Sequence, residues 1–326
     1  MIHADDRRIR VERWLGEQFR GERFALAPAS EDASFRRYFR ATLADGRSFV
    51  IMDAPPDKED CRPFVHVAEL LAQAGVHAPK VHAADFGAGF LLLSDLGTRT
   101  YLAELRPENA DALMRDAIGA LIRWQLATRP NELPPYDEAL LRREMSLFPD
   151  WYVTRHRRLT LSAQQAEALE GIFATLVKSA LAQPAVYVHR DYMPRNLMVS
   201  EPNPGVLDFQ DAVIGPIAYD MVSLVRDAFI SWDEERVLDW TVRYWQNARA
   251  AELPVPPDFA EFWRAFEWMG LQRHLKVLGI FARINYRDGK PKYLADTPRF
   301  IAYARPVAKR YRELAPLLRL LDEIER

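Results

Sequence analysis

The side-chain periodicity of the chain changes at about residue 100, and this change limits the folds that the chain can adopt. Before that point, short strand-like runs alternate with turn residues and with two amphipathic helix patterns. After it, apolar residues recur at helical spacing over long stretches. The two periods belong to different elements. We therefore expect an α+β architecture, with a small β-rich lobe over residues 1–96 and a larger, mostly helical lobe over residues 97–326.

The smaller lobe is predicted to begin with a helix over residues 6–20, followed by the order strand, strand, helix, strand, strand. The first two strands flank Asp45-Gly46, a dipeptide that favours a tight hairpin in which both residues have positive φ. The next helix is predicted over 59–74 and ends at Gly75. The last two strands are predicted over 80–84 and 90–93.

The larger lobe is predicted to be helical apart from one insert. Helical periodicity covers residues 107–127, 137–147, 162–182, 217–229, 233–250, 258–283 and 296–324. The insert over 185–208 instead contains three short apolar runs, at 186–188, 197–199 and 206–207, which polar turns separate. We interpret these runs as strands.

The composition excludes several classes of protein. The chain has 326 residues, of which 49% are hydrophobic, and a formal net charge of −2, so no basic field would attract nucleic acid. Its single cysteine, Cys61, excludes an internal disulfide and a cysteine-based zinc cluster. No run approaches the roughly 18 apolar residues of a membrane span, and no signal sequence is recognisable. We expect a cytoplasmic protein without nucleic-acid or membrane partners, and a monomer is favoured.

Polar residues of the insert occur in an order that is typical of kinases. His189-Arg190-Asp191 is followed by Asn196 in the same turn region, and Asp208 comes after the next strand-like run. Asp191 is predicted to be the catalytic residue that aligns an acceptor hydroxyl and takes its proton. Asn196 and Asp208 are predicted to hold Mg²⁺, which prefers oxygen ligands.

Two neighbouring residues are interpreted as structural. His189 begins the loop and is expected to form a hydrogen bond rather than to act as a base. Asp220 is expected to open the next helix and to brace the backbone of the catalytic loop.

On these motifs, and on the stretch from Gly215-Pro216 to Asp220, the chain resembles the small-molecule kinases of the aminoglycoside phosphotransferase and choline kinase type over nearly its whole length. The resemblance implies a bilobal, protein-kinase-like fold that uses ATP and Mg²⁺. The runs 32–40 and 207–212 resemble more closely the bacterial kinases that phosphorylate the anomeric hydroxyl of N-acetylmuramate and N-acetylglucosamine. That resemblance implies sugar 1-phosphate products and a role in peptidoglycan recycling.

Two departures from the kinase pattern concern the phosphates of ATP. The chain has no glycine-rich loop, and the segment expected in its place contains the predicted nucleotide-binding residues Ser34, Phe35, Arg36 and Arg37. In the following strand, Met52 or a neighbour stands where kinases have a lysine that binds phosphate. Arg36, Arg37 or Arg40 are the candidate substitutes, and Glu69 is the nearest helix acid for the usual ion pair.

The segment 91–97 is predicted to be the hinge that follows the last strand of the smaller lobe. Its backbone at Ser94, Asp95 and Leu96 is expected to bind adenine. In the larger lobe, only about half a dozen residues separate Asp208 from Gly215-Pro216, which leaves no room for the activation segment of a protein kinase. A small-molecule acceptor is therefore favoured.

Aromatic and charged side chains of the helical lobe are suited to an amino sugar, because rings stack on sugar faces and carboxylates bind hydroxyls. The predicted acceptor residues are Glu144, Trp151, Tyr152, Arg273 and His274. The lactyl carboxylate of a muramic acid would require a cation such as Arg273 or Lys276. For each of these residues, packing in the helical core is the alternative.

Two other functions stay open at this point. A kinase that acts on aminoglycosides or on another small molecule such as choline would use the same chemistry on a different acceptor. A catalytically weak, kinase-like nucleotide-binding module is suggested by the missing lysine and glycine loop. The presence of Asp191, Asn196 and Asp208 together argues against this second alternative.

Overall fold

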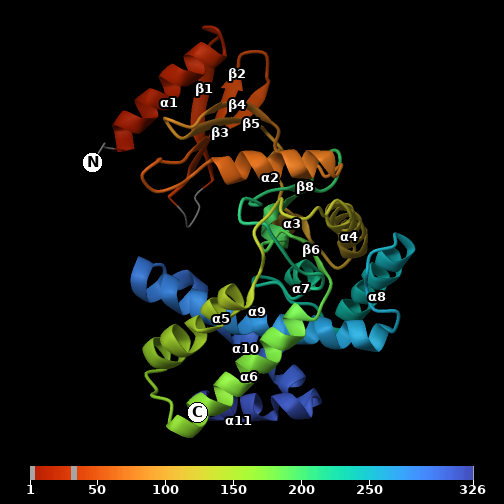
Figure 1. Ribbon diagram of the computed structural model, residues 1–326. Coiled ribbons are helices and arrows are strands. Elements are labelled where there is room, and N and C mark those ends of the chain that lie inside the picture. Colours follow the sequence, from red (N-terminus) through yellow and green to blue (C-terminus); the bar gives the residue numbers. More distant parts are fainter. Residues whose placement is uncertain (1–3, 31–34, 326) are drawn as a thin grey trace. The chain divides into compact units, whose positions relative to one another are not determined.

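A computed structural model describes residues 4–30 and 35–325 of the chain (Figure 1). The chain divides into two compact units. The first unit comprises residues 1–100 and 197–211, and the second comprises 101–196 and 212–326. Residues 97–100 and 197–211, which the sequence assigned to the larger lobe, thus group with the first unit. The domain boundaries at 96 and 97 stay a prediction.

The first unit is built on a five-stranded antiparallel sheet in the order β1-β2-β3-β5-β4. One face is covered by α1 (Ala4–Gln18), whose Val11 and Leu15 are fully buried against residues of the strands (Figure 1). The helix α2 (Arg62–Gln73) connects β3 to β4. The strands are β1 (Phe24–Ser30), β2 (Arg37–Leu43), β3 (Ser48–Asp53), β4 (Val81–Asp85) and β5 (Phe90–Ser94).

The predicted hairpin at Asp45-Gly46 joins β2 to β3, with Thr42 opposite Ser48. Gly46 has a φ of 89°, whereas Asp45 is not among the described residues with positive φ. The turn is therefore of the kind in which a single left-handed glycine closes the loop, and not the form with two left-handed residues that the sequence predicted. The strand β1 was not predicted, because its alanines and Pro28 weaken the strand signal, although an edge strand tolerates proline.

The second unit is helical, as predicted. Its longest helix, α9, is buried along most of its length and packs against α5, α6, α7 and α10. Its α-helices are α3 (Tyr101–Glu104), α4 (Ala110–Leu126), α5 (Glu138–Met145), α6 (Ala163–Leu181), α7 (Tyr219–Val225), α8 (Glu234–Ala250), α9 (Phe259–Asp288), α10 (Thr297–Arg310) and α11 (Ala315–Ile324). Short turns complete it: η1 (Phe148–His156, a π-helix), η2 (Pro194–Asn196), η3 (Pro291–Asp296) and η4 (Arg312–Leu314).

One helix prediction was wrong. The single helix expected over 296–324 is two helices, because the backbone is extended at Tyr311, with φ −112° and ψ 123°. Pro316 lacks an N–H and so fits the first turn of α11, where no intrahelical partner is needed. A proline at that position favours a new helix over the continuation of an old one.

The predicted insert forms two small antiparallel strand pairs. In the second unit, β6 (Ala185–Val188) pairs with β9 (Val213–Pro216). In the first unit, β7 (Leu197–Met198) pairs with β8 (Gly205–Val206). The catalytic loop therefore runs from the end of β6 to η2. Within the described residues, none of the helices has the length and apolar character needed to cross a bilayer.

Candidate active site

The backbone of the catalytic loop is held by a buried acid. The N–H groups of His189 and Arg190 donate to the two carboxylate oxygens of Asp220 at 2.7 and 3.0 Å. Asp220 is 0% exposed, and this burial raises its pKa to about 7 even though both N–H donors favour the ionised form. Asp220 thus braces the loop, as the sequence predicted.

Hydrogen bonds within the loop fix the catalytic candidates. The N–H of Asp191 donates to His189 Nδ1 at 3.2 Å, which makes the buried His189 a structural acceptor, as predicted. The amide Nδ2 of Asn196 donates to the carbonyl of Asp191 at 3.0 Å and so orients the Asn196 side chain. Asp191 itself is half-buried. Asp191 and Asn196 are therefore parts of one rigid loop.

Behind the loop lies a buried ionic network centred on Glu144 of α5. Arg190 Nη2 and Lys276 Nζ donate to its Oε1 at 2.5 and 2.8 Å, and the hydroxyl of Tyr136 donates to its Oε2. Burial opposes the charge of Glu144, but Lys276 and Arg190 outweigh it and lower the pKa of Glu144. The hydroxyl of Tyr219 accepts from Lys276 at 3.0 Å. The sequence predicted Glu144 as an acceptor ligand and did not predict that it supports Arg190.

The predicted acceptor residues of η1 are Trp151 and Tyr152, and Tyr152 contacts Glu325, near the C-terminal end of the chain. Tyr152 is 2% exposed, and its hydroxyl donates to Glu325 at 2.9 Å. Trp151 is half-buried, with the guanidinium of Arg155 6.0 Å from its ring centre. Their part in acceptor binding stays a prediction.

The predicted acceptor residues of α9 lie in a different place, next to the end of α7. Arg273 is 2% exposed and donates to the carbonyl of Arg226 at 3.4 Å. His274 is 3% exposed, with its ring 5.2 Å from that of Tyr303, and burial lowers the pKa of His274 well below its usual value. Burial raises the pKa of Asp227, which the sequence analysis did not single out, and the charge of Arg273 opposes that rise. The five predicted acceptor residues are therefore distributed over three neighbourhoods.

The predicted metal ligand Asp208 belongs to the first unit. It follows β8 with a φ of 62°, and Gln210 Nε2 donates to its Oδ1 at 2.9 Å. The next residue, Phe209, is fully buried, with its ring 4.6 Å from that of Phe64 in α2. This packing anchors the backbone next to the carboxylate.

The residue types of the two predicted ligands suit Mg²⁺, because kinases hold it with one carboxylate and one amide oxygen while phosphate and water supply the rest. Within the described residues there is no group of three or more His, Cys, Asp or Glu side chains that could hold a metal alone. A metal that shares its ligands with the phosphates of ATP fits this composition. The roles of Asp208 and Asn196 as its ligands stay predictions.

The segment predicted to bind adenine begins at the end of β5. Ser94 Oγ accepts from the N–H of Lys80 at 2.9 Å. Asp95 accepts from Arg40 Nε at 2.6 Å and from the N–H of Gly97 at 2.9 Å. Burial works against ionisation, but these donors outweigh it and lower the pKa of Asp95. The N–H of Ser94 donates to the carbonyl of Lys80 at 2.9 Å, and the backbone contacts to adenine from Ser94, Asp95 and Leu96 stay a prediction.

The segment predicted to cover the phosphates precedes β2. Ser34 lies outside the described residues, and Phe35 is 64% exposed. Arg36 and Arg37 are each ion-paired to an acid that the sequence analysis did not single out, Glu59 and Asp53 respectively. Glu69 is exposed on α2, which suits a solvated helix face. The sequence does not identify Glu59 as a partner of Arg36, because acids are common at the start of helices for other reasons.

The fold and the loop agree with comparisons to known proteins. Residues 25–262 match the model of the phosphotransferase enzyme family. The chain belongs to this family, and it is a phosphotransferase.

Named relatives cover the whole chain. It is 55% identical to the N-acetylmuramate/N-acetylglucosamine kinase of Pseudomonas putida, over 100% of this chain and 98% of the relative. It is 59% identical to the kinase of the same name from Pseudomonas aeruginosa, over 92% and 88% of the two chains. The fold is also that of a streptomycin–ATP–APH(2")-IIa ternary complex, with a TM-score of 0.59 at 16% identity over 92% of this chain and 97% of that one.

Proposed function

We propose that this chain transfers the terminal phosphoryl group of ATP to the C1 hydroxyl of N-acetylmuramate or N-acetylglucosamine. The product would be a sugar 1-phosphate, which suits the return of cell-wall amino sugars to nucleotide-activated precursors. The names of the relatives support the acceptor. The neighbouring fold with bound ATP supports the donor.

The observation that carries the proposal is the catalytic loop. Asp220 fixes the backbone before Asp191, and Asn196 is bonded to the carbonyl of Asp191. A carboxylate on so rigid a loop can align a sugar hydroxyl and accept its proton as the phosphorus–oxygen bond forms. Asp191 is thus the proposed catalytic base.

Asn196 and Asp208 would hold Mg²⁺ with the phosphates, and the metal would supply positive charge to the oxygens of the transferred group. The neighbouring residues of the chain would orient the Asp208 carboxylate toward the metal. Gln210 donates to Asp208, and the buried Phe209 fixes its backbone. Phe35 and Arg36 are proposed to contact the phosphates together with Ser34, whereas Arg37, the fourth predicted residue, is bonded to the buried Asp53.

For the acceptor, Arg273 is the proposed partner of the lactyl carboxylate. The ammonium of Lys276 is already bonded to Glu144 and Tyr219, whereas the hydrogen bond of Arg273 to the Arg226 carbonyl is long, at 3.4 Å. His274 lies next to Arg273 on α9, and Trp151 offers a half-buried ring. Glu144 is bonded to Tyr136, and Tyr152 is bonded to Glu325. Substitution of either residue would therefore break a bond within the protein as well as any contact with the sugar.

The experiment is an acceptor panel with ATP and Mg²⁺ in which ADP release is measured and the product is identified by phosphorus NMR. The panel contains N-acetylmuramate, N-acetylglucosamine, kanamycin, choline and the methyl glycoside of N-acetylglucosamine. We expect turnover of the two free sugars, with the phosphorus coupled to the anomeric proton. The methyl glycoside should be inert, because its C1 oxygen carries no proton.

Phosphorylation of the methyl glycoside would contradict transfer to C1. A higher kcat/KM for kanamycin or choline than for either sugar would contradict the proposed acceptor while leaving the phosphoryl chemistry intact.

A further inference from the structure

The strand β3 carries no cation that could bind the phosphates of ATP. Its sequence is Ser-Phe-Val-Ile-Met-Asp, and Met52, at the position where a lysine is expected, is 1% exposed. Protein kinases place a lysine on this strand, where it pairs with a helix glutamate and binds phosphate. A cation that takes the place of this lysine on the sheet would belong to the first unit.

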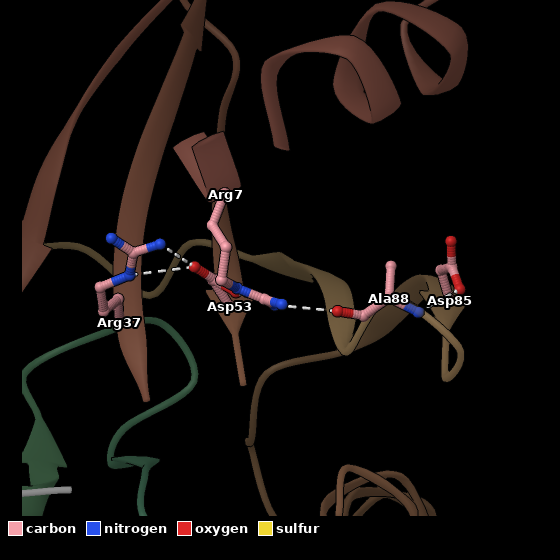
Figure 2. Close-up of polar contacts among 5 residues, drawn as sticks. All are labelled: Arg7, Arg37, Asp53, Asp85 and Ala88. Atoms are coloured by element: carbon pink, nitrogen blue, oxygen red, sulfur yellow. Dashed lines mark hydrogen bonds and ion pairs between the residues drawn. The ribbon is translucent and has the colours of Figure 1, made fainter. Parts of the chain in front are cut away.

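Arg37 is committed to a structural clamp around Asp53 (Figure 2). Asp53 is 0% exposed, and Arg37 Nε donates to its Oδ2 at 3.0 Å. Arg7 of α1 donates to Oδ1 through Nε at 2.8 Å and to the carbonyl of Ala88 at 2.9 Å. Both oxygens of the carboxylate are therefore bonded to arginines. The clamp joins α1, β2, β3 and the turn between β4 and β5.

The alternation of side chains along β2 and β3 places Arg37 on the face of the sheet that α1 covers. Arg37 is directly opposite Asp53, and Phe39 is opposite Ile51, which belongs to the core under α1. Because successive side chains of a strand point to opposite faces, Tyr38 and its partner Met52 face the other side of the sheet. A cation that replaces a lysine at position 52 must lie on that side.

Arg36, the residue before Arg37, is the candidate for that side. Its Nη2 donates to Glu59 Oε2 at 3.1 Å, and the two side chains are only 12% and 18% exposed. Burial disfavours its charge, yet Tyr38, Glu59 and Asp211 together raise the pKa of Arg36. Tyr38 is the residue opposite Met52, and Asp211 is in the segment that carries Asp208. Arg36 is thus a largely buried guanidinium that is bonded to Glu59 and interacts with Tyr38, the partner of Met52, and with Asp211, three residues after the predicted metal ligand.

We infer that Arg36, oriented by Glu59, binds the terminal phosphates of ATP and replaces the strand lysine of kinases. The inference rests on the proposed function, because it takes ATP as the donor. A guanidinium has five N–H donors in a planar fork, so one edge can bind a carboxylate while another binds phosphate oxygens. Glu59 would then act as a positioning residue, in the part that the helix glutamate has in kinases.

The test is a titration without sugar, in which binding of the non-hydrolysable ATP analogue AMP-PNP with Mg²⁺ is compared with binding of adenosine. Arg36→Met should weaken AMP-PNP about 10- to 100-fold, as expected for the loss of charge-assisted hydrogen bonds, and leave adenosine binding unchanged. Arg36→Lys should recover part of the loss. The control is Arg47→Met, which removes an exposed arginine paired with Asp45 and Glu22 in the same unit and should bind both ligands normally.

Glu59→Gln should weaken AMP-PNP less than Arg36→Met does, and it should add nothing when combined with Arg36→Met, because Glu59 acts through Arg36. An Arg36→Met protein that binds AMP-PNP as tightly as the natural protein overturns the inference. Equal weakening of AMP-PNP and adenosine also overturns it, since the effect would then not concern phosphate. Because no acceptor is present, a wrong sugar assignment would not change these results.

Discussion

The catalytic loop is supported by two acids that have no contact with solvent or nearly none. Asp220 accepts from the backbone N–H groups of His189 and Arg190, which precede Asp191, and Glu144 accepts from the guanidinium of Arg190. Arg190 has a φ of 74°, a conformation that a non-glycine residue adopts at a cost of about 1–3 kcal/mol unless its surroundings impose it. The two acids impose it here. The backbone geometry of the catalytic loop is therefore fixed by its bonds to Asp220 and Glu144.

Asp191→Asn should lower kcat about 10²- to 10⁴-fold, because the amide keeps the shape of the side chain and cannot accept the proton. The melting temperature should stay within a degree or so of the natural value. Steady-state rates with N-acetylmuramate and a thermal melt test this. Asp239→Asn, at an exposed position paired with Arg243, is the matched control. An Asp191→Asn enzyme within tenfold of the natural rate would show that Asp191 is not the base.

Asp220 gives stability a pH dependence of defined sign. Its pKa of about 7 in the folded protein lies above the ordinary value of 3.8, so the folded state binds the proton more tightly. This contribution is complete below pH 4 and is lost as the pH rises through 7. Asp220→Asn cannot titrate. In urea unfolding, the stability advantage of the natural protein over this variant should be larger at pH 5 than at pH 8. Parallel pH profiles of the two proteins would contradict the prediction.

At the residue scale, the sequence was informative where residue types occur in a fixed order. Asp191, Asn196 and Asp208 were proposed from their spacing, and the bracing role of Asp220 was confirmed by its bonds to His189 and Arg190. Glu144, Glu59 and Asp53 were not recognised as partners of arginines. Such pairs join positions that are far apart in the sequence, and a single sequence contains no signal of long-range pairing.

Among the elements, α9 determines the packing of the second unit, because it contacts α5, η1, α6, α7 and α10. It contributes both Lys276 and Arg273, so the network behind the catalytic loop and the proposed acceptor residues share one helix. Its close contact with the segment before η1 occurs at Gly279. A Cβ at this position would overlap the backbone of Leu147.

Gly279→Ala should therefore lower the free energy of unfolding by about 1–3 kcal/mol, the usual cost of overpacking. The control is Gly171→Ala on the exposed face of α6, where a Cβ would meet no atom within 4 Å. That change should stabilise the protein by about 0.5–1 kcal/mol, because alanine is the better helix former. Urea unfolding of both variants tests this pair. Equal effects of the two substitutions would contradict the close contact.

At the element scale, long and strongly periodic helices were predicted well, for example α6 and α8, whose ends carry Ser162 and Asp233 as N-caps. The break at Tyr311 and the π-helix η1 were missed. The break at Tyr311 falls inside a stretch whose apolar spacing remains helical, so Pro316 is its one local signal, and η1 follows the end of the helix predicted over 137–147. The strand β1 was missed for the opposite reason, because its own residues are weak strand formers and its partner β2 supplies the pairing.

At the scale of the whole molecule, the resemblance seen in the sequence was confirmed, since the chain belongs to the phosphotransferase enzyme family and its fold is kinase-like. Composition and periodicity alone predicted only a small β-rich part and a larger helical one. The motifs supplied the rest, because a catalytic loop of this kind is characteristic of one family of folds. The predicted site residues are divided between the two units, with Asp208 in the first and Asp191 and Asn196 in the second.

AMP-PNP should raise the melting temperature more with Mg²⁺ than without it, because a bound ligand stabilises the folded state by about 2.7 kcal/mol at 100 times its Kd. Asp208→Asn should abolish the additional shift that Mg²⁺ causes. Asp57→Asn, at an exposed position of the same unit, should retain it. A shift in the natural protein that does not depend on Mg²⁺ would contradict the metal role of Asp208 and would favour a nucleotide-binding module without catalysis.

Segment 197–211 belongs to the first unit although residues 101–196 of the second unit precede it in sequence, and this affects the design of chimaeras with relatives. The segment is tied to that unit by the bond from the N–H of Val206 to the carbonyl of His77, and it carries Asp208. A chimaera that exchanges only the first hundred codons with a relative would join a foreign five-stranded sheet to the original segment with Asp208, the proposed metal ligand. Recombination that respects the units needs crossovers at three points, after residues 100, 196 and 211.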